Sequence, residues 1–130
     1  LASQNRLFET NEYITDPLTI EYFFKSVNHL ILPYRNFYGS SGVMLQALGY
    51  NIPVFVPDVG IIGYRVKKYN LGLTYNKESF EKQFLNFINT PSESFAGSIK
   101  HYMQTQSVQN LNSVLVKVLS PDSESKFKFF

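Results

Sequence analysis

Hydrophobic positions between residues 17 and 75 follow two different spacings. Three short apolar runs, at 30–33, 53–57 and 71–75, are typical of strands inside a parallel sheet. Before and between these runs, apolar residues recur every three or four positions, as on one face of an amphipathic helix. The alternation predicts parallel strands joined by helical crossovers. These helices are expected over 17–27, 43–48 and 60–69.

Helical spacing continues alone after residue 75. Phe80, Phe84 and Phe87 recur on one face of segment 77–89, which predicts a helix whose rings lie in the core. Two more helices are expected, over about 95–103 and 108–119.

A short edge strand is expected at 7–14, ahead of the first helix. The predicted fold is therefore α/β: a three-layer, Rossmann-like parallel sheet of about four strands, with helices on both faces and a helical C-terminal end. Residues 1–120 are expected to form one domain and 121–130 a tail. That tail carries three Phe and two Lys, which fits either a mobile end or contact with a membrane surface.

The loop between the first apolar run and the helix at 43 is rich in small residues, Gly39-Ser40-Ser41-Gly42. It opens directly onto a helix N-terminus, where free backbone N–H groups and the positive end of the helix dipole favour an anion. A tight strand-to-helix turn would use the same residues. The loop matches neither a Gly-x-Ser-x-Gly nucleophile elbow nor a Gly-x-Gly-x-x-Gly or Walker loop.

Composition excludes several other kinds of chemistry. The net charge of +2 is too small to argue for nucleic acid as a partner. The chain has no Cys, and its two histidines, His29 and His101, have no metal-ligand spacing, so no metal site is expected. No apolar run reaches the roughly 18 residues that a membrane span needs, and no signal peptide is visible. An intracellular, cytoplasmic location is expected.

Six short motifs occur in a characteristic order and spacing. They are Pro33-Tyr34-Arg35, Gly39-Ser40-Ser41-Gly42, Gln46-Ala47-Leu48, Pro53-Val54, Pro57-Asp58-Val59-Gly60 and Leu71-Gly72-Leu73. Together they resemble the C-terminal domain of retaining GT-B glycosyltransferases, of the group 1 or family 4-like kind, and the resemblance covers roughly residues 11–88. It implies a domain that binds a nucleotide diphosphate sugar, while a separate N-terminal domain binds the acceptor.

The resemblance also assigns roles to individual residues. Ser40, Ser41 and Gly42 would lie at the donor diphosphate, with main-chain amides and hydroxyls as donors. Tyr13 and Ile14 would border the base. Further donor contacts are expected from Gln46 to the ribose hydroxyls, from Arg35 to phosphate and from Tyr38 beside the transferred sugar.

The sequence departs from that family at two points. Many members carry two Glu where this chain has Tyr38 and Gln46, so no catalytic acid is assigned. The family's Arg/Lys pair and its acceptor domain would both precede this sequence. The resemblance therefore implies the later part of a donor domain, inactive alone, with no cofactor besides the nucleotide sugar. Its acceptor would be a glycan or a lipid-linked glycan, reached in the cytoplasm or at the inner face of the membrane.

Alternatives stay open for several residues and for the function. Arg35 could pair with an acidic neighbour instead of a phosphate, and Asp58 could serve its turn. The rival function is a non-catalytic Rossmann-like module that binds a nucleotide or serves assembly.

Overall fold

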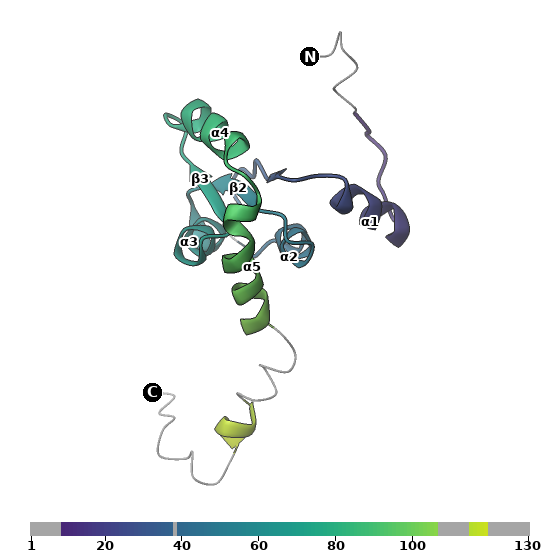
Figure 1. Ribbon diagram of the computed structural model, residues 1–130, viewed down its shortest axis with the longest axis vertical. Helices are drawn as coiled ribbons and strands as arrows, with labels where there is room; N and C mark the ends of the chain where they lie inside the picture. Colours follow the sequence, from purple (N-terminus) through teal and green to yellow (C-terminus); the bar gives the residue numbers. More distant parts are fainter. Residues whose placement is uncertain (1–8, 38, 107–114, 120–130) are drawn as a thin grey trace.

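The computed structural model describes residues 9–37, 39–106 and 115–119. It shows an α/β fold with a three-stranded parallel sheet in the order β1-β2-β3 (Figure 1). The strands are β1 (Leu30–Ile31), β2 (Val54–Pro57) and β3 (Gly72–Tyr75). The helices are α1 (Pro17–Lys25), α2 (Gly42–Gly49), α3 (Gly60–Tyr69), α4 (Phe80–Asn89) and α5 (Glu93–Thr105).

The expected fourth strand is not formed by the described part of its segment. Residues 9–14 have no strand structure, and residues 7 and 8 lie outside the described ranges. Four of these six residues are polar, and Tyr13 is 92% exposed, so the segment has little apolar surface to bury in a sheet. The sheet of about four strands is therefore corrected to three, and β1 hydrogen-bonds only to β2 within the described chain.

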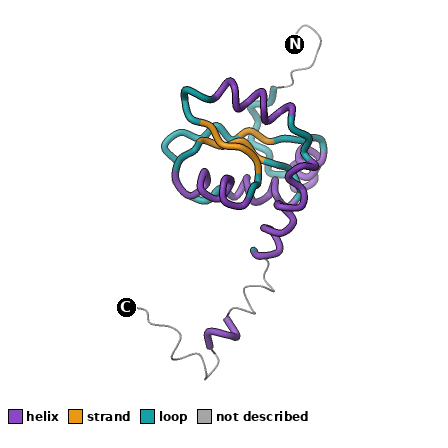
Figure 2. The backbone as a smooth tube through the Cα atoms, turned by 60° about the vertical axis from the view of Figure 1, so that its left-hand side comes forward, coloured by secondary structure: helices purple, strands orange, loops and turns teal. Residues whose placement is uncertain are grey.

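Helices cover both faces of the sheet, as expected (Figure 2). The central β2 is buried along its whole length. The Phe55 ring lies against the rings of Phe84 and Phe87, which places α4 on one face. Side chains alternate along a strand, so Val54 and Val56 lie on the other face, where α2 and α3 pack. Of the predicted ring-rich face, Phe87 is in the core and Phe84 packs against it, whereas Phe80 is 39% exposed.

The α5 helix packs against α2 and α3, and its buried residues complete the core (Figure 1). The turn that leads into it is held by His29, whose Nε2 lies 2.8 Å from the Thr90 carbonyl oxygen. The His29 ring also stands edge-on to Phe87. His29 therefore connects the amino end of β1 to the link between α4 and α5.

The α1 helix starts where the sequence predicts. Asp16 is its N-cap and accepts a hydrogen bond from the Thr19 N–H at 3.1 Å, and Pro17 occupies the first helical turn. Hydrogen bonds from the Thr19 hydroxyl and N–H hold the pKa of the Asp16 carboxyl below its ordinary value. The helix ends at Lys25, two residues earlier than expected, where the Ser26 N–H bonds the Tyr22 carbonyl.

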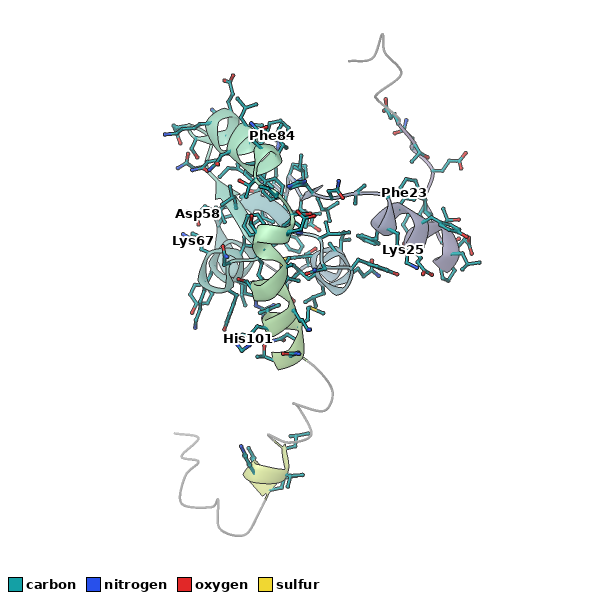
Figure 3. The ribbon with its side chains drawn as sticks, viewed as in Figure 1. Phe23, Lys25, Asp58, Lys67, Phe84 and His101 are labelled. Atoms are coloured by element: carbon teal, nitrogen blue, oxygen red, sulfur yellow. The ribbon has the colours of Figure 1, made fainter. Side chains whose placement is uncertain are left out.

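The α1 helix stands away from the sheet and buries none of its residues. Leu18 and Tyr22 are 62% and 69% exposed. Figure 3 shows Phe23 and Lys25 on this helix, to one side of the sheet. The ring of Phe24 stacks on Tyr50, 5.4 Å between centroids, and holds the helix beside the end of α2.

The helix expected over 108–119 is only partly described. Residues 115–119 are helical, and residues 107–114 lie outside the described ranges. The tail at 121–130 also lies outside them. In the described part of the chain, no helix has the length and apolar character to cross a bilayer.

Candidate functional site

The N-terminus of α2 is shaped by Ser41, the residue that precedes the helix. The Ser41 Oγ accepts a hydrogen bond from the Met44 N–H at 3.0 Å, and Ser41 is 2% exposed. This cap satisfies one of the donors that a helix start leaves unpaired. The N–H groups of Gly42 and Val43 donate to no atom of the described residues. Two backbone donors and the helix dipole thus face the loop.

Tyr34 holds the loop that leads to α2. Its hydroxyl lies 2.7 Å from the Ser41 Oγ, and its ring stacks on Phe37 with 4.4 Å between centroids. Asn36 lies between these two residues in the sequence. It adopts φ 50°, a left-handed conformation that Asn tolerates. Tyr34 belongs to one of the motifs but has no role in the predicted site. The isolated sequence offered no signal that its hydroxyl would reach a residue seven positions later.

We expect Ser41→Ala to lower the free energy of unfolding by about 1–2 kcal/mol, because it removes the cap of α2 and leaves Tyr34 without its partner. Urea denaturation followed by circular dichroism measures this loss. Ser40→Ala is the matched control, since Ser40 is exposed and forms no hydrogen bond with a described residue. Equal stability of the two variants would contradict the role given to Ser41.

Four of the expected donor-site residues lie together, but the hydroxyl of one of them, Ser41, is buried and does not face the loop surface as expected. Ser40 and Gly42 are exposed at the start of α2. Gln46 is exposed one turn later and, at spacings of three and four, shares a helix face with Val43 and Gly42. The opposite face of α2, with Met44, Ala47 and Leu48, is buried.

Arg35 lies in a groove at the carboxyl ends of the strands. The groove has a volume of about 790 Å³ and is lined by residues that follow each strand in turn. Arg35 is exposed and forms no ion pair with a described residue, so it does not have the acidic neighbour considered above. The groove residues are Pro33, Tyr34, Arg35, Pro57, Asp58, Val59, Tyr75, Asn76, Lys77 and Phe80.

The carboxylate in this groove is already paired. Asp58 Oδ1 lies 2.7 Å from the Nζ of Lys67, and Figure 3 shows the two side chains next to each other. The sequence had suggested that Asp58 serves the turn through its own side chain. In the structure, that carboxylate instead joins the turn after β2 to the last turn of α3.

Tyr13 and Ile14, the residues expected to border the base, make no described contact with the loop that leads to α2. Neither Tyr13 nor Ile14 forms a hydrogen bond or ring contact with a described residue of the loop at 33–42. Tyr13 is almost fully exposed. Tyr38, the position at which many family members carry an acid, lies outside the described residues.

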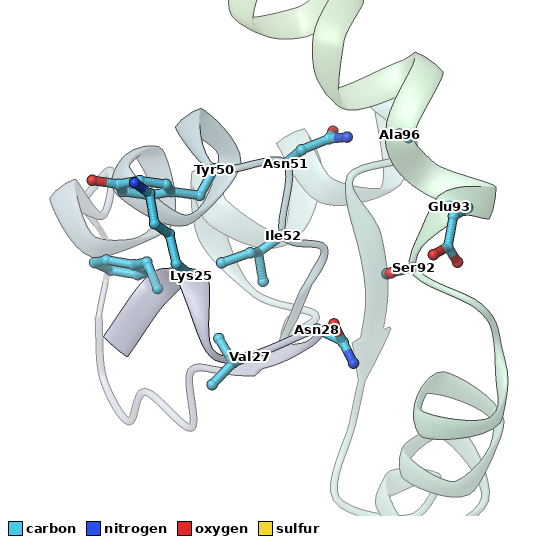
Figure 4. Close-up of a pocket in the computed structure, with 10 residues that line it drawn as sticks. Lys25, Val27, Asn28, Tyr50, Asn51, Ile52, Ser92, Glu93 and Ala96 are labelled. Carbon is cyan, nitrogen blue, oxygen red and sulfur yellow. The ribbon is translucent and has the colours of Figure 1, made fainter. Parts of the chain in front are cut away.

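A second hollow, of about 340 Å³, lies at the amino ends of the strands (Figure 4). It is bounded by α1, by the turn after α2 and by the start of α5. The ends of α1 and α2 meet here through the stack of Phe24 and Tyr50. Ligands of open α/β sheets bind at the carboxyl ends of the strands, so the α2 terminus and its neighbouring groove are the stronger candidate.

Comparison of the chain with models of protein families, with curated proteins and with solved structures found no match. Function is therefore argued from the residues themselves.

Proposed function

We propose that this chain is the donor-binding part of a GT-B glycosyltransferase. Such an enzyme moves a sugar from a nucleotide diphosphate sugar to a glycan or a lipid-linked acceptor. The observation that carries the proposal is the N-terminus of α2, which leaves the Gly42 and Val43 N–H groups available at the carboxyl edge of a parallel sheet. The ordered motifs described above support it further.

In this proposal each exposed polar group at the start of α2 contacts a part of the donor. The two N–H groups and the Ser40 hydroxyl bind the diphosphate, while Gln46 bonds the ribose hydroxyls. The buried Ser41 hydroxyl positions the loop, because it is held by Met44 and Tyr34. Charge that develops on the leaving diphosphate is stabilised by the helix terminus and by Arg35. The acceptor is bound by another domain, in the cytoplasm or at the inner face of the membrane.

Calorimetric titration of the chain with UDP, GDP and ADP tests the proposal. We expect one of these diphosphates to bind, and its monophosphate to bind at least about tenfold more weakly, because charge-assisted hydrogen bonds to the lost phosphate are removed. We expect Gly42→Val to weaken diphosphate binding by a similar factor, since the added side chain covers the exposed N–H groups.

Gly49→Ala is the control for this variant. A Cβ at either glycine would meet nothing within 4 Å, so both positions have room for a first side-chain carbon. Unchanged diphosphate affinity in Gly42→Val, or the same loss in both variants, would contradict binding at α2.

A second candidate function is a non-catalytic assembly module, and the exposure of α1 favours it. That helix exposes Leu18, Tyr22 and Phe23 to solvent and has no fully buried residue, which is typical of a surface that binds a partner. An assembly module is expected to show no response to any nucleoside diphosphate in the same titration.

A further inference from the structure

The groove at the carboxyl ends of the strands has features that the donor site does not use. It spans all three strands, with Arg35 after β1, Pro57 and Asp58 at the end of β2, and Lys77 after β3. Neighbouring strands lie about 4.8 Å apart, so the residues that follow β1 and β3 start roughly 10 Å apart. Two long basic side chains therefore flank one hollow from opposite walls.

The unpaired charges that line this groove are positive. Asp58 is its one acidic lining residue, and its carboxylate is neutralised by Lys67 at 2.7 Å. Arg35 and Lys77 are exposed, and neither forms an ion pair with a described residue. Arginine and lysine side chains free of carboxylates favour a phosphate or carboxylate group.

Aromatic rings form the wall on the β3 side. Phe80 is 39% exposed and stands edge-on to Tyr75, with 4.8 Å between centroids. The loop beneath them is fixed, because Asn76 and Ser79 exchange hydrogen bonds between side chain and backbone, at 2.8 and 3.1 Å. The wall therefore offers a rigid apolar surface with a hydroxyl at its edge, suited to a ring that also carries polar groups.

Burial raises the pKa of the Tyr75 hydroxyl, and the charge of Arg35 opposes that rise. The hydroxyl is thus neutral at physiological pH and can donate a hydrogen bond into the groove. It forms none with a described residue.

We propose that this groove binds an anionic sugar, whose phosphate or carboxylate lies between Arg35 and Lys77 and whose ring packs against Tyr75 and Phe80. The site shares Arg35 with the proposed donor site and goes beyond it, because Tyr75 ends strand β3 and Lys77 and Phe80 follow it, away from α2. The two basic side chains match the anionic group of such a sugar, and the aromatic wall matches its ring.

Amide chemical shifts of the ¹⁵N-labelled chain test the proposal during titration with glucose 6-phosphate, glucuronate, neutral glucose and inorganic phosphate. We expect at least one anionic sugar to shift the amides of Arg35, Asn76 and Lys77, and neutral glucose to leave them unchanged. Which anionic sugar binds more tightly distinguishes a phosphorylated unit from a uronic acid. Inorganic phosphate is expected to bind more weakly than that sugar, because it lacks the ring.

Lys77→Gln is expected to weaken this binding about tenfold, through the loss of one charge-assisted hydrogen bond. Lys82→Gln, which removes an exposed lysine of α4 outside the groove, is the matched control. The proposal is overturned by absent shifts, by phosphate binding as tightly as the sugars, or by binding that survives Lys77→Gln. A nucleoside diphosphate titration of Lys77→Gln separates the two sites, since only the donor site is retained there.

Discussion

Gly72→Ala is expected to destabilise the fold severely. Gly72 starts β3 beside Val54 of β2 and adopts φ 153°, a conformation that other residues rarely take. A Cβ at this position would lie 1.8 Å from the Val54 carbonyl oxygen. Because β2 is fully buried and closely packed, it cannot shift away from the added Cβ. We expect a loss of roughly 4 kcal/mol or more, against a total stability of about 5–15 kcal/mol for a typical domain.

Soluble yield and urea denaturation followed by circular dichroism measure this effect. Gly97→Ala is the control, because Gly97 lies within α5 and a Cβ there meets nothing within 4 Å. Removing a glycine from an exposed helix interior is expected to stabilise the protein by up to about 1 kcal/mol. A cooperative Gly72→Ala protein with nearly unchanged stability would show that β2 and β3 do not meet as described.

Phe55→Ala is expected to lower the free energy of unfolding by about 3–5 kcal/mol. The Phe55 side chain is completely buried. Its ring contacts four others from β3 and α4, with centroids between 4.7 and 6.2 Å away, so truncation leaves a cavity at the centre of the aromatic core. The contacting rings are those of Tyr75, Phe80, Phe84 and Phe87.

Phe23→Ala provides the comparison for this truncation. Phe23 is 48% exposed on α1 and makes no ring contact with a described residue. Its removal is expected to change stability by no more than about 0.5 kcal/mol. Comparable losses in the two variants, measured by urea denaturation, would contradict the assignment of Phe55 to the core.

The sequence predicted those strands whose segments are mostly apolar. The apolar runs at 30–33, 53–57 and 71–75 contain the three strands, and Asp16-Pro17 marks the start of α1. The segment 7–14 misled because its four apolar residues suggest a strand, although a strand also needs a neighbouring strand to pair with. A local sequence pattern does not indicate whether such a neighbouring strand is present.

The candidate site was predicted less completely, for a related reason. Ser40, Gly42 and Gln46 are close in sequence, so one helix start brings them together. Lys77 and Tyr75 were missed because they reach the groove through the pairing of β2 with β3, a contact between distant segments. The roles of Tyr34 and Asp58 likewise depend on side-chain geometry that a one-dimensional pattern does not contain.

The basic residues of the groove lie outside the core, so substitutions there affect the fold little. Arg35 and Lys77 are exposed residues of loops, whereas the sheet is held by Phe55 and its neighbours beneath them. Substitutions at the two basic positions therefore alter ligand preference at little cost in stability. Libraries randomised at positions 35 and 77 should yield mostly folded proteins, and the scaffold can acquire new specificities by point mutation.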